Sequence, residues 1–186
     1  MQKNIFYLDM DGVCADWDRG VRELGYVTRA RAGSTYTVDV DTWVRLCQQH
    51  PNLYRNLPLM QSVDQLVTVA RQYRDLLGWG LYFLTAIPSK NDVPDAFSDK
   101  VAWARDHFPD IGVRFGPYAV DKQQHCRAGD ILVDDRSSNC AQWRDRGGLA
   151  FHVTGNTLMS VLPQLQQDLS RRLSLLRLRN LSLDIF

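Results

Sequence analysis

Two aspartates, Asp9 and Asp11, directly follow a short run of apolar residues, and Gly12 comes next. Carboxylates at this spacing can act as a nucleophile, a general acid or a metal ligand. The apolar run over residues 5–8 contains aromatic and β-branched side chains, which is typical of a strand buried on both faces of a parallel sheet. Gly12 permits a sharp turn where that strand ends. Ligands bind at the carboxyl ends of strands in open α/β sheets, so the pattern favours a site, although an ordinary strand running into an Asp-Gly turn has the same local sequence.

Two later apolar runs also end in polar side chains. One leads to Thr85, and the other leads to Asp134 and Asp135. Lys122 follows a further short candidate strand between them. Strands that alternate with helices form a mostly parallel sheet with right-handed crossovers. The chain therefore places carboxylates, a hydroxyl and a lysine after the strands of one predicted sheet.

This set of residues resembles the four sequence motifs of the haloacid dehalogenase (HAD) superfamily of phosphotransferases. Within that superfamily, the segments that begin at Asp9, Asp121 and Asp134 are most similar to those of the 5'(3')-deoxyribonucleotidases. The resemblance covers residues 4–153. It implies an α/β fold, namely a HAD-like Rossmannoid three-layer domain with a parallel sheet and a small helical cap inserted after the first strand.

The resemblance implies hydrolysis of a phosphate monoester through a covalent intermediate, with Asp9 as the nucleophile. An aspartate ordinarily has a pKa of about 3.9, so we expect Asp9 to be ionised at neutral pH without special tuning. Asp11 would first act as the general acid and then as the general base. Residues two apart in an extended segment are separated by roughly 6.6 Å, which leaves room for a phosphoryl group.

Magnesium is the cofactor that the resemblance implies. An anionic nucleophile attacking an anionic phosphate needs positive charge, and Mg²⁺ supplies it through oxygen ligands. We expect Asp9 and Asp135 to bind Mg²⁺, with the backbone carbonyl of Asp11 as a third ligand. Asp134 would support this set from behind.

Thr85 and Lys122 are the expected phosphate-binding residues. A threonine hydroxyl can donate a hydrogen bond to a phosphate oxygen, and a lysine adds a compact positive charge. The chain departs from the family pattern at Ala86, where the family often has a second hydroxyl residue. One phosphate hydrogen bond is therefore expected to be missing.

Three residues are expected to bind the rest of the substrate. Trp17 matches an aromatic position that lines the base pocket in deoxyribonucleotidases, and Arg136 matches a substrate-facing arginine. Trp43 falls, with Tyr54, where the family's cap carries aromatic residues, and an aromatic face can stack on a base. A residue of the cap core is an equally good interpretation of Trp43.

Composition limits the class of protein. With 186 residues, 45% of them hydrophobic and 23% charged, the chain is long enough for one domain with a sizeable core and a small inserted subdomain. Its net charge of +1 argues against an extended nucleic-acid or membrane surface, and no apolar run reaches membrane-spanning length. The four cysteines form no C-x-x-C pair, and no signal peptide is evident, so we expect a reduced, cytoplasmic setting.

The predicted domains are a HAD-like catalytic core over residues 1–15 and 61–156, a small helical cap over residues 16–60, and an amphipathic helical tail over residues 157–186. Predicted strands cover residues 5–8, 81–84, 113–115, 131–133 and 149–153, and predicted helices cover residues 41–49, 62–77, 95–108 and 139–146.

Three details of the predicted helices bear on the site and the tail. Ser62 to Gln65 has the form of a capping box. Val101, Ala104 and Phe108 are expected on one face of the helix over residues 95–108, whereas Lys100 is expected to be solvated rather than to reach the site.

The tail carries a leucine stripe with several arginines. We expect the stripe to pack on the parent domain, with a homodimer contact through the C-terminal helix as the alternative; acidic residues and the near-neutral charge disfavour membrane-surface binding.

The predicted function is hydrolysis of nucleoside monophosphates, preferably of deoxyribonucleotides, with Mg²⁺. Two alternatives remain open. The same chemistry could act on another small phosphate ester or on a terminal phosphate of nucleic acid. A weakly catalytic binding or assembly protein could also use this fold, but gathered carboxylates repel one another without a metal, which argues against it.

Overall fold

A five-stranded parallel sheet forms the centre of the molecule. The computed structural model describes residues 3–30, 36–88, 93–154 and 157–183. The strand order is β5-β4-β1-β6-β7, and all four neighbouring pairs are parallel. The strands are β1 Ile5–Leu8, β4 Gly80–Thr85, β5 Gly112–Phe115, β6 Ile131–Asp134 and β7 Leu149–His152. The predicted strands are confirmed within a residue or two at each end.

Strand β1 is buried on both faces, as its unbroken apolar sequence predicts. Phe6 and Leu8 belong to the larger core cluster, whereas Ile5 and Tyr7 belong to a second cluster with Trp143. Side chains alternate between the faces of a strand, so each face of β1 contacts a different layer.

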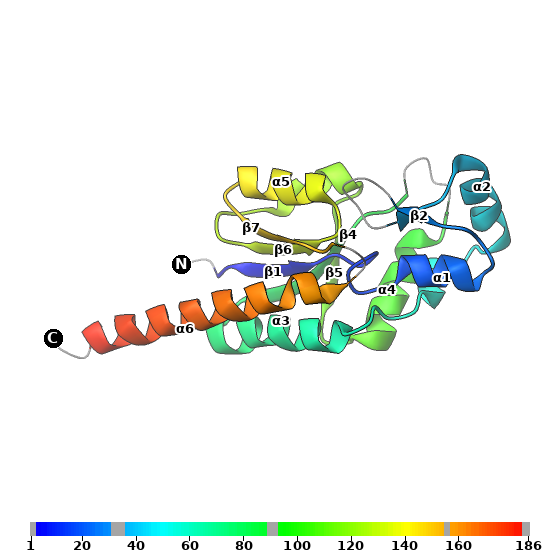
Figure 1. The fold of residues 1–186 in the computed structure, drawn as a ribbon. Helices are drawn as coiled ribbons and strands as arrows, with labels where there is room; N and C mark the ends of the chain where they lie inside the picture. The colour runs from blue at the N-terminus through cyan, green and yellow to red at the C-terminus, as the bar shows by residue number, and fades with distance from the viewer. Residues whose placement is uncertain (1–2, 31–35, 89–92, 155–156, 184–186) are drawn as a thin grey trace.

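Helices cover both faces of the sheet, which gives the predicted three layers. Figure 1 shows α5 on one face and α3 and α6 side by side on the other. The helices of the core and tail are α3 Val63–Leu77, α4 Ala96–His107, α5 Ser137–Asp145 and α6 Leu162–Leu183. The architecture is therefore the HAD-like α/β Rossmannoid fold that the sequence predicted.

The segment after β1 lies beyond the end of the sheet toward which β1 points (Figure 1). Its elements are α1 Trp17–Glu23, β2 Arg29–Ala30, β3 Tyr36–Thr37, α2 Val40–Gln49 and the 3₁₀ helix η1 Tyr54–Asn56. The sequence predicted α2 but neither α1 nor the β2–β3 hairpin. Helix α1 is short and contains Gly20, where a Cβ would lie 2.7 Å from a methyl carbon of Leu57, so close packing explains the glycine. The predicted division into core, cap and tail stays a prediction.

Two predicted details of the helices are wrong. Ser62 precedes α3 in a left-handed conformation (φ 66°) and its side chain makes no capping hydrogen bond, so the predicted capping box does not form. On α4, Val101 is 39% exposed, while Trp103 is fully buried with Ala104 and Phe108. The apolar face of α4 is thus rotated from the predicted one.

Helix α6 begins by packing on the domain and then continues past it. Leu165 and Leu169 are buried, and the Tyr73 hydroxyl on α3 donates to the Leu165 carbonyl at 3.0 Å. Leu176 and Leu178 are exposed. The prediction that the stripe packs on the parent domain is confirmed for its first half. Within the described residues, no helix combines the length and apolar character needed to cross a membrane.

Candidate active site

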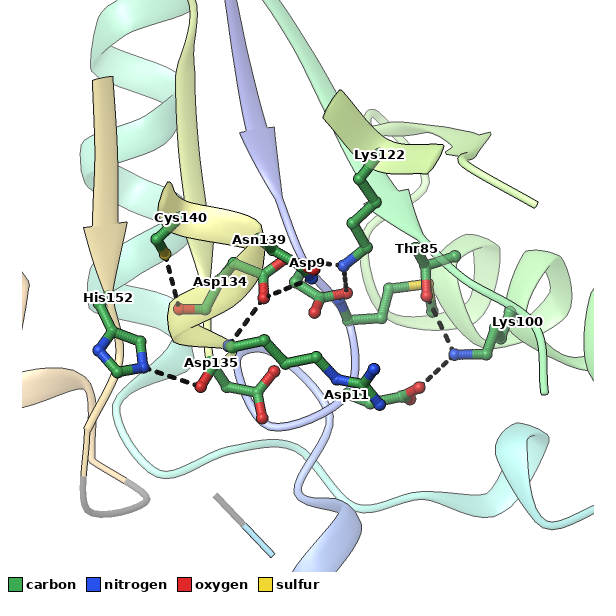
Figure 2. Close-up of polar contacts among 12 residues, drawn as sticks. Asp9, Asp11, Thr85, Lys100, Lys122, Asp134, Asp135, Asn139, Cys140 and His152 are labelled. Carbon is green, nitrogen blue, oxygen red and sulfur yellow. Dashed lines mark hydrogen bonds and ion pairs between the residues drawn. The ribbon is translucent and has the colours of Figure 1, made fainter. Parts of the chain in front are cut away.

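The polar residues predicted at the strand ends lie together at one edge of the sheet (Figure 2). Asp9 follows β1, Thr85 ends β4, and Asp134 ends β6. Because these three strands are parallel neighbours, their carboxyl ends share this edge. Gly12 has φ 77°, a conformation that favours glycine, and it turns the chain away after the second aspartate.

Three carboxylates form a compact oxygen cluster. Asp9, Asp134 and Asp135 are buried, and one oxygen from each lies within 4.8 Å of the others. Carboxylate oxygens are the ligands that Mg²⁺ prefers, and buried carboxylates gathered this closely repel one another unless a cation lies among them. The donor set therefore fits a divalent metal. The Asp11 carboxylate instead forms an ion pair with Lys100. Metal binding by the backbone carbonyl of Asp11 stays a prediction.

Asp134 is held by donors from several directions. Its oxygens accept from Lys122 Nζ at 2.8 Å, from the backbone N–H of Arg136 at 2.8 Å, and from Asn139 Nδ2 at 3.0 and 3.1 Å. Asn139, which the sequence did not single out, thus fixes this carboxylate. The contacts fit the supporting role predicted for Asp134.

Lys122 is fully enclosed between two carboxylates. Its ammonium lies 2.7 Å from Asp9 Oδ1, and the residue comes from the 3₁₀ helix η3 Ala119–His125. Burial opposes the charged form, but the charges of Asp134 and Asp9 outweigh it and raise the pKa of Lys122. A Cβ at Gly116 would lie 2.7 Å from the backbone nitrogen of Lys122, so that glycine allows the approach.

Asp9 does not behave as an ordinary aspartate. Burial raises its pKa to about 7; the Lys122 charge opposes this shift, and the charges of Asp134 and Asp11 add to it. The prediction that Asp9 needs no tuning is therefore wrong, because it took no account of burial. The ionised form of Asp9 depends on the positive charge around it. Its Oδ1 also accepts from the backbone N–H of Met10 at 2.7 Å, which fixes the plane of the carboxylate.

Lys100 reaches the site, so the prediction that it is solvated is wrong. It is fully buried, forms an ion pair with the Asp11 carboxylate, and donates to Thr85 Oγ1 at 3.0 Å. The signal was present in the sequence, since Ala96, Lys100 and Trp103 follow one another at helical spacing. Asp99, the neighbour of Lys100, is also buried.

The comparison with known families decides which group this site belongs to. The model of the 5' nucleotidase, deoxy (pyrimidine), cytosolic type C protein family matches residues 3–162. The chain belongs to this family. A search of curated proteins found no match.

Membership in this nucleotidase family makes the chain a phosphoric monoester hydrolase of the HAD type. The predicted superfamily, fold and enzyme class are therefore confirmed. The matched region ends at the first residue of α6, so nearly all of that helix lies outside it.

The three predicted substrate residues of this nucleotidase come from two helices of the inserted segment and from the residue before α5. Trp17 begins α1 and Trp43 lies on α2, and both are half-buried against the main core. Arg136 precedes α5 and is half-buried, next in the chain to the Asp134–Asp135 pair. Their roles in substrate binding stay predictions.

Proposed function

We propose that the protein hydrolyses deoxyribonucleoside monophosphates with Mg²⁺ through an aspartyl-phosphate intermediate. The observation that carries the proposal is the buried cluster of Asp9, Asp134 and Asp135 with the Lys122 ammonium against Asp9. Asp9 and Asp135 would hold the metal, with Asp134 beside them in support, and the metal when bound supplies positive charge to the phosphate and to the nucleophile. The family's deoxy (pyrimidine) description supports the substrate class.

The first step is attack by the Asp9 carboxylate on phosphorus, with cleavage of the ester P–O bond. Met10 N–H and Lys122 hold Asp9 Oδ1, which orients the carboxylate for attack. Asp11, in its protonated form, gives its proton to the departing nucleoside oxygen and becomes ionised. Its side chain is 31% exposed, far more than that of Asp9, so it has access to substrate and water.

The second step is hydrolysis of the aspartyl phosphate. The Asp11 carboxylate, now ionised, accepts a proton from a water molecule whose oxygen attacks phosphorus, and the bond to Asp9 breaks. Thr85 donates a hydrogen bond to a phosphate oxygen, and Lys122 balances its negative charge. The products are inorganic phosphate and the nucleoside.

The test is a phosphate-release screen with purified protein. The substrates would be deoxyribo- and ribonucleoside 5'- and 3'-monophosphates, p-nitrophenyl phosphate, common phosphorylated metabolites and a 5'-phosphorylated oligonucleotide. We expect the highest kcat/KM for a deoxyribonucleoside monophosphate with Mg²⁺ and no release in excess chelator. A higher kcat/KM for a non-nucleotide ester or for the oligonucleotide would support the alternative substrates. No release from any compound would support a binding protein.

A cytoplasmic location and a homodimer through α6 belong to the same proposal. The exposed Leu176 and Leu178 near the end of α6 support a contact there. Sedimentation equilibrium of the whole chain and of a Leu176→Glu/Leu178→Glu variant would test it. A dimer that the two glutamates dissociate would support this contact, and a wild-type chain that is monomeric would exclude it.

A further inference from the structure

Lys100 is a buried lysine whose ammonium group contacts three partners from other parts of the chain. It is fully buried on α4, and its neighbours on that face include the fully buried Trp103 and Ala104. Burial of an ammonium is unfavourable unless it is paired, so an apolar residue would suit the packing better. The ammonium contacts the Asp11 carboxylate, the Thr85 hydroxyl and the face of the Tyr54 ring, whose centroid is 4.4 Å away.

The contact with Thr85 decides where its hydroxyl proton points. Lys100 has only donors, so Thr85 Oγ1 must be the acceptor in their 3.0 Å hydrogen bond. The single proton of the hydroxyl is then left for another acceptor. The end of β4 places that proton at the edge of the sheet where the phosphate would bind.

The contact with Asp11 restrains the most exposed carboxylate of the site. Asp11 lies in a loop after β1, and a carboxylate that is 31% exposed can rotate into water unless something holds it. The Lys100 side chain is 1% exposed and comes from a helix, so it is a rigid support. Figure 2 shows Lys100 and Asp11 on the side of the site away from His152.

The contact with Tyr54 brings in the segment inserted after β1. Tyr54 lies in η1 and is buried, and α4 packs closely on η1. One turn along α4 from Lys100, the Trp103 indole donates to the Leu57 carbonyl at 2.7 Å, just after η1. Helix α4 thus joins the inserted segment to the reacting groups.

We propose that Lys100 is a positioning residue that orients Asp11 and Thr85 for phosphoryl transfer and ties their placement to the inserted segment through Tyr54. This inference rests on the proposed function, in which Asp11 protonates the leaving oxygen. Loss of Lys100 would then weaken protonation of the leaving group more than it weakens binding.

The test compares phenyl phosphate with p-nitrophenyl phosphate. The two esters have nearly the same shape, but phenolate is the stronger base and needs its proton more in the transition state. In Lys100→Met, we expect kcat/KM for phenyl phosphate to fall about 100-fold or more, which is within the range that general acid catalysis supplies. The fold-loss for p-nitrophenyl phosphate should be smaller by a factor of about ten or more. Lys100→Arg should recover part of the loss. Lys3→Met, the same change at an exposed lysine, should alter neither ester.

Tyr54 is tested in the same assay. Tyr54→Leu removes the ring face, so kcat/KM should fall more for phenyl phosphate than for p-nitrophenyl phosphate, as in Lys100→Met. Tyr54→Phe keeps the ring, so the difference between the two esters should be smaller. Methionine fills a volume similar to that of lysine, and apolar replacements of buried charges are often tolerated, so we expect Lys100→Met to fold. If it does not, Lys100→Arg and the Tyr54 variants carry the test.

Equal losses for both esters in Lys100→Met would overturn the inference, because a merely structural role affects both alike. This outcome differs from failure of the proposed function. In that case the wild-type protein would release no phosphate, or Asp9→Asn would keep its activity.

Discussion

The Lys122 ammonium lies 2.7 Å from Asp9 Oδ1, although the two residues are far apart in the chain. The strand order explains the contact, since β1 and β6 are neighbours and η3 directly precedes β6 in the chain. The lysine opposes the burial that raises the pKa of Asp9 and so favours the ionised nucleophile. The predictions below follow from this site and from the packing that supports it.

Asp9→Asn is expected to abolish phosphate release and leave the fold intact. The amide is nearly isosteric with the carboxylate but cannot form an acyl phosphate. Steady-state phosphate release and a thermal melt measure the two effects, with Asp145→Asn, the same change at an exposed site, as the control. Substantial activity in a clean preparation of Asp9→Asn would exclude the covalent mechanism.

Asp135→Asn and Asp134→Asn are expected to differ in kind. We expect Asp135→Asn to raise the Mg²⁺ concentration for half-maximal activity about tenfold or more, because it removes a metal ligand. Asp134→Asn should change that concentration less and lower the Tm more, since Asp134 pairs with Lys122 and accepts from Asn139. Mg²⁺ titrations and thermal melts of both variants check this. The reverse pattern would exchange the two roles.

Trp17→Ala is expected to impair the reaction of nucleotides selectively. Base stacking is worth roughly 1–3 kcal/mol, so kcat/KM for a deoxyribonucleoside monophosphate should fall about ten- to a hundredfold. The kcat/KM for p-nitrophenyl phosphate should change much less. Equal losses on both substrates would mean that the half-buried ring only holds the packing at the start of α1.

Asp110→Asn is expected to destabilise the protein only at pH values at which Asp110 is ionised. Hydrogen bonds from Arg71 and then Arg74 hold the pKa of Asp110 well below its ordinary value. A carboxyl group whose pKa is lower in the folded state stabilises the fold at pH values above its unfolded pKa of about 3.9. This stabilisation is lost as the pH falls through the folded-state pKa. Because the side chain is 37% exposed, we expect a loss of about 1 kcal/mol at pH 7.

Urea unfolding of wild type and Asp110→Asn at a series of pH values measures this difference. It should shrink as the pH falls below the unfolded value. A difference that is the same at acidic and neutral pH would show that the carboxylate charge is not its cause.

Leu165→Ala is expected to destabilise the protein by about 2–5 kcal/mol, because it opens a cavity under α6 where it packs on α3. Leu178 is 64% exposed near the end of the same helix, so Leu178→Ala should change the free energy of unfolding by less than about 0.5 kcal/mol. Denaturant unfolding of both variants measures the contrast. Similar losses in the two would mean that the end of α6 is also covered in solution.

The amino-acid sequence by itself determined the strands and the polar residues that follow them. A strand buried on both faces needs a continuous apolar run, so residues 5–8 and 131–133 could be recognised locally. The polar residues after such runs must meet at one edge of a parallel sheet, which made Asp9, Thr85 and Asp134 predictable.

Only the tertiary structure decided which polar groups are buried and what they contact. The prediction that Lys100 is solvated was wrong because its partners Asp11 and Tyr54 come from other segments of the chain. The ordinary pKa expected for Asp9 failed because Asp9 is buried and the charges around it come from the loop after β1, from β6 and from η3. Burial and charge depend on contacts between distant segments, and a local pattern of residue types does not contain those contacts.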